Sequence, residues 1–203
     1  MKAIPLAAVL LLTGCLARPR LDQQSFIFAP PPPPAPAVAP GHRVLGIRSL
    51  QVAAPFEGRA FVYRTGEYSY DSDPYAQFMV PPAEGLTAPI CRWWREAGEF
   101  RDVVETGSAL KPDTLVEIHV AQLYGDFRPL ENPAAVLAIR FVFFDAQNGF
   151  PGKVILRREC SRRVPLKART PSALMEAWNQ ALAQILDSTV LELGRNDANS
   201  PNP

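Results

Sequence analysis

The chain has 203 residues, which is enough for one domain of ordinary size with its own hydrophobic core. Its composition, 47% hydrophobic and 20% charged, is typical of a globular protein and excludes a disordered or fibrous chain. Lysine and arginine number 21 against 20 aspartates and glutamates, so no strong net charge favours nucleic acid or an acidic membrane surface as a partner.

The first fifteen residues have the pattern of a signal peptide. Lys2 precedes an apolar run from Ala3 to Leu12, which is too short to span a bilayer but suits the hydrophobic part of a signal sequence. Thr13, Gly14 and Cys15 follow directly. The pattern leucine, small residue, glycine, cysteine resembles the lipobox of bacterial lipoproteins.

The lipobox resemblance implies a lipid anchor at Cys15. In that class the signal, here residues 1–14, is cut before the cysteine, which then carries a diacylglycerol on its thiol and a further acyl chain on its amino group. Two acyl chains already suffice for stable anchoring. The residue after Cys15 is Leu16 and not the aspartate that is associated with inner-membrane retention of lipoproteins. By this resemblance the anchor is expected on the periplasmic face of the outer membrane. The alternative is an N-terminal helix packed into the core, with an inert cysteine.

A proline-rich stretch follows, "APPPPPAPAVAPG" from Ala29 to Gly41. Proline restricts φ and lacks an N–H donor, so we expect a polyproline II conformation that rises about 3.1 Å per residue. We therefore interpret residues 15–43 as the lipidated cysteine and a semi-rigid tether that holds the domain away from the lipid surface. A PxxP ligand for an SH3-type module is the alternative.

The folded domain is predicted to span residues 44–194. Leucine and β-branched residues at 43–53 predict a first strand. Alternating aromatic residues on both sides of Thr65-Gly66 predict a hairpin over 59–71. Asp-Pro and Pro-Pro pairs predict that 71–82 is a loop.

A helix is predicted from Pro82 to Gly98. It has proline at its start, Glu84 in its first turn and an apolar stripe at helical spacing, formed by Leu86, Ile90, Trp93 and Ala97. Pro89 lies inside it and removes one backbone hydrogen bond, at a cost of about 3 kcal/mol. We expect either a kink at Pro89 or a helix that begins nearer Thr87.

Three strands in an antiparallel meander are predicted at 114–127, 134–149 and 152–166, the second ending in the turn signal Asn148-Gly149. Thr170 is placed to cap a final helix that ends at Gly194. Its apolar stripe consists of Leu174, Trp178, Ala181, Leu182, Ile185, Thr189 and Leu193. Residues 195–203 are predicted to be a disordered tail. The order of elements predicts an α+β fold, a two-layer sandwich in which two main helices cover a mostly antiparallel sheet.

No catalytic, phosphate-binding or metal-binding motif is present in the sequence, so we expect no catalytic residues, metal or cofactor. His42 in the tether and His119 on a polar strand position are expected to be solvated. Cys91 and Cys160 are open to two interpretations. An oxidising periplasm permits a disulfide between them, and two buried thiols are the alternative.

Aromatic residues are concentrated in and after the predicted hairpin. Strand alternation explains some of them as core or cross-strand pairs. The surplus would form a partner-binding surface, because tyrosine is enriched at binding hot spots. The candidates are Tyr63, Tyr68, Tyr70, Tyr75 and Phe78.

Four phrases of the domain together resemble one family. They are "FVYRTGEYSYDSDPYAQFMVPPAEGL", "FRDVVETG", "AVLAIRFVFFD" and "PSALMEAWNQALAQILDSTV", spread over residues 44–193. In order and spacing they are similar to the ABC-type transport auxiliary lipoproteins, which include the PqiC-like proteins. The resemblance implies a non-enzymatic accessory of a periplasmic lipid-transport system, in which an ABC transporter works with an MCE-domain protein that bridges the envelope.

In that system the lipoprotein would sit on the outer membrane and dock the MCE-domain protein. A second hypothesis is an assembly or pilot lipoprotein that escorts an outer-membrane pore or secretin. A third is an anchored hydrolase, which lacks a recognisable nucleophile and base.

Overall fold

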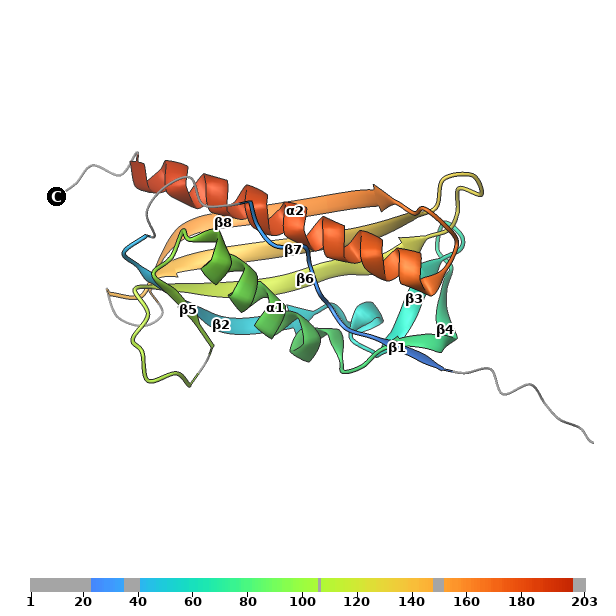
Figure 1. Cartoon of the computed structure of the whole chain (residues 1–203), viewed down its shortest axis with the longest axis horizontal. Helices are drawn as coiled ribbons and strands as arrows, with labels where there is room; N and C mark the ends of the chain where they lie inside the picture. Colours follow the sequence, from blue (N-terminus) through green and yellow to red (C-terminus); the bar gives the residue numbers. More distant parts are fainter. Residues whose placement is uncertain (1–22, 35–40, 106, 148–151, 199–203) are drawn as a thin grey trace, which may run out of the picture.

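The computed structural model describes residues 23–34, 41–105, 107–147 and 152–198, which form an eight-stranded mixed sheet with two helices on one face (Figure 1). The α+β class predicted from the sequence is confirmed. Three long strands form the antiparallel meander: β6 (Thr114–Asp126), β7 (Ala134–Asp145) and β8 (Lys153–Pro165). The inward positions of β6 and β7 are buried as their alternation predicts.

The remaining strands make the sheet mixed. β2 (Val44–Val52) pairs in parallel with β6 on one side and with the short β5 (Asp102–Val104) on the other. β3 (Ala60–Arg64) also pairs in parallel with β6, near the end of that strand. Among the described strands, the antiparallel pairs are therefore β6–β7, β7–β8 and β3–β4. Parallel pairing needs a long connection, and the chain between β2 and β5 supplies one that includes a helix.

The segment predicted to be a loop at 71–82 is instead mostly a strand, β4 (Tyr70–Phe78). It pairs with β3 over Tyr70 to Ser72 and again at Gln77, with an irregularity between the two ladder segments. Pro74 lies in that irregularity, where no ladder bond needs its missing N–H. The Asp73 carboxylate accepts hydrogen bonds from the backbone N–H groups of Tyr75 at 2.8 Å and Ala76 at 3.0 Å, which holds the chain there. The prediction missed the strand because it took Asp-Pro as a loop signal.

The first helix, α1 (Pro82–Ala97), has nearly the predicted bounds. It ends at Ala97 and is capped by Gly98, which has a φ of 77° and takes the left-handed conformation that favours glycine at a helix C-terminus. The alternative start near Thr87 is wrong, because the helix runs continuously through Pro89. The Pro89 ring is buried, so its packing offsets part of the lost hydrogen bond.

The second helix, α2 (Pro171–Ala198), begins as predicted. The backbone N–H of Ala173 donates a hydrogen bond to Thr170 Oγ1 at 3.2 Å, and Pro171 is the first helical residue. Every residue of the predicted apolar stripe is buried. The predicted end at Gly194 is wrong, because the helix continues to Ala198. A glycine inside a helix costs only about 1 kcal/mol relative to alanine, so it need not end one.

The predicted tether is partly wrong, because residues 23–34 belong to the folded domain. We call these residues the strap. It begins with β1 (Gln24–Phe26), which pairs in parallel with β4. The strap then passes across both helices (Figure 1): the indole N–H of Trp93 on α1 donates to the Pro31 carbonyl at 2.9 Å, and the Ala29 N–H donates to Asn179 Oδ1 on α2 at 2.9 Å. The domain therefore begins well before Val44.

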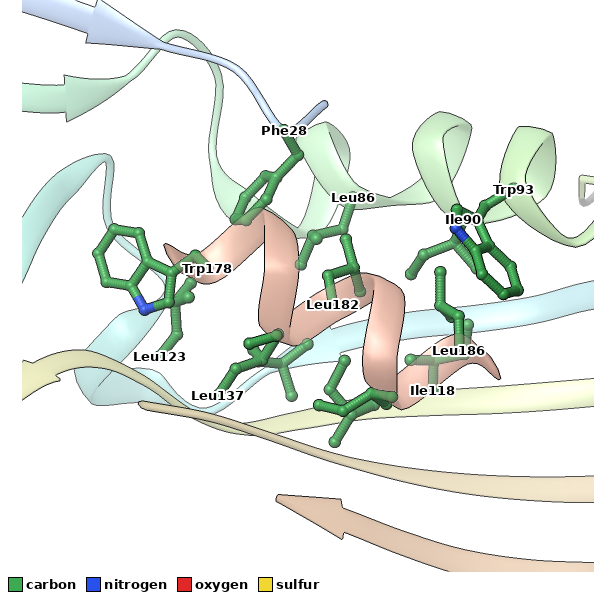
Figure 2. Close-up of a cluster of buried hydrophobic side chains, with 14 of the residues drawn as sticks. Phe28, Leu86, Ile90, Trp93, Ile118, Leu123, Leu137, Trp178, Leu182 and Leu186 are labelled. Atoms are coloured by element: carbon green, nitrogen blue, oxygen red, sulfur yellow. The ribbon is translucent and has the colours of Figure 1, made fainter. Parts of the chain in front are cut away.

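The hydrophobic core lies between the helices and the sheet, and the strap contributes to it. Phe28 is buried near Leu86, Trp178 and Leu182 (Figure 2). Its ring stacks on Phe78, with centroids 5.1 Å apart. Within the part of the chain that the structure describes, neither helix is long and apolar enough to cross a membrane.

Candidate docking surface

The β3–β4 hairpin presents tyrosines to solvent. Its turn is closed by a hydrogen bond from the Thr65 N–H to the Ser69 carbonyl at 3.0 Å. Tyr68 lies in this turn and is 88% exposed, and Tyr70 and Tyr75 on β4 are nearly half-exposed. We call these three tyrosines the hairpin surface. Three of the five predicted aromatic residues are thus available to a partner.

Tyr70 is held in place by its neighbours. Its ring meets the Phe56 and Tyr124 rings edge-on, with centroids 6.2 Å and 5.6 Å away. The Arg64 guanidinium lies 5.6 Å from the Tyr70 centroid, on the scale of a cation–π contact. Because the ring is already ordered, a partner that binds it loses little side-chain entropy.

Phe78 does not belong to the surface. It is only 3% exposed and packs against the rings of Phe61 and Trp178, with centroids 4.7 Å and 5.5 Å away. Its place opposite Phe26 in the β1–β4 ladder turns it into the core. The prediction that included Phe78 is corrected to a core role.

Tyr63 is half-buried and makes a strong polar contact. Its hydroxyl donates to Asp73 Oδ2 at 2.6 Å. Burial, and then the Asp73 carboxylate, raise the pKa of the Tyr63 hydroxyl well above its ordinary value. The hydroxyl therefore stays protonated at neutral pH and links β3 to the irregular part of β4.

A shallow cleft of about 400 Å³ lies beside Tyr63. One wall is Phe127, whose ring meets Tyr63 edge-on at 4.9 Å, and Arg169 extends over Phe127 with its guanidinium 4.8 Å from the ring centroid. Gly125 makes this approach possible, since a Cβ there would lie 2.7 Å from a Phe127 ring carbon and 3.1 Å from a Tyr63 ring carbon. Asp71, Asp73 and Arg169 also line the cleft, so it holds charges of both signs.

A buried carboxylate braces the same end of the sheet. Asp126, at the end of β6, accepts two hydrogen bonds from Arg128, at 2.8 Å and 2.9 Å, and Arg163 on β8 approaches to 3.8 Å. Hydrogen bonding from Arg128 holds the pKa of Asp126 below its ordinary value. Sequence reasoning missed both this group and the cleft. The sequence Asp-Phe-Arg at 126–128 gives no local pattern that indicates the buried carboxylate or the cleft, because the other residues that form them, Arg163 and Arg169, are distant along the chain.

A second exposed feature lies where the strap meets α1. Ile27 and Met79 are 63% and 53% exposed, and Val80 is also exposed. We call these three residues the β1 patch. They adjoin a groove of about 430 Å³ whose lining includes the apolar residues Phe26, Phe28, Ala88 and Pro89. Sequence reasoning missed the patch because it assigned Ile27 and Phe28 to the tether.

The two described cysteines are buried free thiols. Cys91 lies on α1, whereas Cys160 lies on β8 beneath α2, with its Sγ 3.8 Å from Ser188 Oγ and 3.9 Å from Thr189 Oγ1. The structure thus holds the alternative to a disulfide, two buried thiols. Burial, reinforced by the Glu105 charge, raises the pKa of Cys91 to about 11, which makes its thiol unreactive at neutral pH.

The other candidate residues form no chemical centre. His42 is exposed, and His119 is half-buried on the sheet face opposite the helices. Among the described residues, no group of three or more histidine, cysteine, aspartate and glutamate side chains is placed to hold a metal ion. The lipobox residues, from Leu12 to Cys15, and the turn signal at Asn148-Gly149 lie outside the described residues.

A family model matches residues 26–189, and the chain belongs to that family, the ABC-type transport auxiliary lipoprotein components. The match begins inside β1, which agrees with a domain that includes the strap. The resemblance drawn from the four sequence phrases is therefore confirmed. No curated protein matches the chain at a significant level.

The solved structures that match the chain include two that share its fold over most of their length. Protein XCC0632 from Xanthomonas campestris has a TM-score of 0.73 and 18% sequence identity, with 87% of this chain and 100% of that chain covered. An uncharacterized protein has a TM-score of 0.65 and 14% identity, with 85% of this chain and 99% of that chain covered. At these identities the likeness shows the fold alone.

Proposed function

We propose that this protein is a lipoprotein anchored through Cys15 on the periplasmic face of the outer membrane. There it docks the MCE-domain partner of an ABC transporter for lipids and performs no catalysis itself. Membership of the auxiliary lipoprotein family supports the link to an ABC transporter. The lipobox-like Leu12 to Cys15 and the following Leu16 support the anchor and its membrane.

The observation that carries the docking proposal is the exposed hairpin surface. Tyr68 extends into solvent, and Tyr70 and Tyr75 lie on the adjoining strand. Large rings on a stiff hairpin bury much area with little loss of side-chain freedom, which is how hot-spot tyrosines act. The neighbouring cleft adds Arg169 and two carboxylates to its lining, so it offers charge contacts that orient a partner.

The first test is crosslinking in the intact envelope followed by identification of the captured protein. We then expect replacement of Tyr68, Tyr70 and Tyr75 by serine together to lower recovery of the MCE-domain partner at least 10-fold. A loss of only about 1.4 kcal/mol of binding free energy suffices for that change. The matched control is Leu110→Ser with Val154→Ser, two exposed apolar residues outside the hairpin surface.

Tyr68→Ser alone separates binding from folding, because Tyr68 is almost fully exposed. We expect this variant to melt like the wild type and still bind the partner several-fold more weakly. Unchanged recovery in the triple variant would make the hairpin surface wrong. Capture of an outer-membrane pore or secretin, with no MCE-domain protein, would replace the proposal by the pilot function.

A further inference from the structure

We propose that the β1 patch and its groove rest on the phospholipid surface of the membrane that carries the anchor, so that the domain lies against the bilayer. The inference rests on the proposed lipidation of Cys15. It concerns a different surface from the partner-binding tyrosines, namely Ile27, Met79 and Val80.

The first argument is the length of chain between the anchor and the fold. β1 begins at Gln24, nine positions after Cys15. Nine extended residues span at most about 32 Å, and a flexible segment of that length averages roughly 15–18 Å. A tether as long as residues 15–43 would have reached roughly 100 Å when extended. The proline run does not supply that distance, because Pro31 is held on the domain by Trp93.

The second argument is where the short segment enters the domain. Gln24 pairs with Ala76, and two residues later Phe26 pairs with Phe78. The Met79 N–H donates to the Phe26 carbonyl at 2.8 Å, which places Met79 directly beside the strap. The chain therefore enters the fold next to the β1 patch, and the anchor draws this patch toward the bilayer.

The third argument is the chemistry of the groove beside the patch. Its lining is mainly apolar, and α1 adds Glu84 and Arg92, which have opposite charges. An apolar groove flanked by one carboxylate and one guanidinium complements a zwitterionic phospholipid, whose phosphate and ammonium lie above its acyl chains.

The anchor makes even a weak contact effective. Once the acyl chains are inserted, the patch is confined near the bilayer, so its contact with lipid behaves like an intramolecular step. The effective concentration of the patch at the lipid surface is set by the short segment after Cys15. A partner protein that is not already attached to this chain would have no such advantage at this patch. We therefore assign the patch to the lipid and the hairpin surface to the protein partner.

The test uses lipidated full-length protein reconstituted in vesicles of phosphatidylethanolamine and phosphatidylglycerol, with doxyl quenchers on part of the acyl chains. An environment-sensitive fluorophore is attached at Met79→Cys or, as the matched control, at Leu110→Cys. Both positions are about half-exposed, and Leu110 lies beyond β5, away from the patch. The native thiols of Cys91 and Cys160 are buried, so the label goes to the new cysteine.

We expect the label at position 79 to shift to shorter wavelength and to be quenched several-fold more than the label at 110. Equal quenching at both positions, or none at 79 in protein whose mass confirms the acyl chains, would overturn the membrane contact and leave the anchor standing. Shielding at 79 that arises only after the MCE-domain partner is added would reassign the patch to that partner. A mature protein without acyl chains would remove the basis of both proposals.

Discussion

At the scale of single residues, Asp126 shows how the end of the sheet that carries the β3–β4 hairpin is stabilised. Its carboxylate is almost inaccessible to solvent, whereas its partner Arg128 is partly exposed. A buried charge of this kind is tolerated because the two hydrogen bonds from Arg128 and the charge of Arg163 replace the water it has lost. The contact joins the β6 end to the loop after it and to β8, close to the cleft.

We expect Asp126→Asn to lower the free energy of unfolding by about 1–3 kcal/mol, because the amide supplies one acceptor where the carboxylate supplied two. Asp102→Asn is the matched control. The Asp102 carboxylate also accepts a hydrogen bond from an arginine, Arg95, at 3.0 Å, but both side chains are partly exposed to solvent. Loss of this ion pair should therefore lower the free energy of unfolding by less than about 1 kcal/mol. Urea unfolding of both variants measures the difference. Equal losses would show that the burial of Asp126 carries no extra energy.

The lowered pKa of Asp126 also gives an acid dependence. A carboxyl whose pKa is lower in the folded state than in the unfolded state contributes stability above the unfolded pKa of about 3.9. That contribution disappears as the pH falls through the folded-state value. We expect wild type and Asp126→Asn to converge in unfolding free energy in this acid range, as measured by urea titrations at a series of pH values. A gap between them that stays constant into strong acid would contradict the assignment.

The thiols give a second residue-scale prediction. Because burial raises the pKa of Cys91 to about 11, only a trace of its thiolate exists at neutral pH. Cys160 is as deeply buried as Cys91. Since a reagent reaches neither thiol in the folded protein, we expect both to react with a thiol reagent in native protein at least 100-fold more slowly than in denatured protein. Leu110→Cys serves as the exposed control and should react at the denatured rate. A disulfide in the mature protein would leave no thiol to react even after denaturation, which mass measurement would detect.

At the scale of elements, the strap is the feature that changes the interpretation of the chain. Phe28 is buried against Phe78, whereas its neighbour Ile27 is mostly exposed. We expect Phe28→Ala to destabilise the fold by about 3–5 kcal/mol and Ile27→Ala by less than about 0.5 kcal/mol. Thermal or urea unfolding measures both. Similar small effects would mean that the strap does not contribute to the core.

The elements that could be predicted from the sequence are those whose signal is local. Strand alternation located the meander, and Thr170-Pro171 located the start of α2. The strap could not be recognised, because proline-rich composition usually indicates a chain outside the core and the residues that hold it, Trp93 and Asn179, are far along the sequence. The parallel pairing of β2 with β6 was missed for the same reason, since register between distant segments leaves no local pattern.

For the candidate docking surface, the sequence predicted that aromatic residues gather at the hairpin but not which of them are exposed. Alternation identified an aromatic hairpin, and Tyr68, Tyr70 and Tyr75 are indeed at the surface. It could not separate them from Phe78, whose burial depends on pairing with Phe26 in a segment that was expected to be a tether. The cleft depends on Phe127 and Arg169, which only the closed fold brings beside the hairpin.

At the scale of the whole molecule, the two proposed surfaces belong to one end. Figure 1 shows β1 and the β3–β4 hairpin at the same end of the sheet, with the loop between β6 and β7 beside them. A partner that binds the hairpin surface would therefore approach close to the bilayer on which the β1 patch rests. Such an arrangement suits an accessory protein that positions a transport component at a membrane.

The extent of the domain can be tested with two truncations. We expect removal of residues 1–22 to change the melting temperature by no more than about 2 °C, because this truncation leaves the whole strap, including β1, in place. Removal of residues 1–43 takes away β1 and Phe28, and we expect it to lower the melting temperature by roughly 10 °C or more. Circular dichroism melts compare the two. Equal melting temperatures of the two truncated proteins would mean that the strap adds no stability and that the tether extends to residue 43, as the sequence predicted.

The strap also bears on the order in which the molecule folds. Residues 114–198 form the meander and α2 from neighbours in sequence, whereas Ala29 must meet Asn179, 150 positions away. Contacts between distant segments form late in folding, because the intervening loop must first be closed. We therefore expect the strap to dock after the helices that receive it have formed. The segment that follows the proposed anchor at Cys15 would then be the last to join the fold.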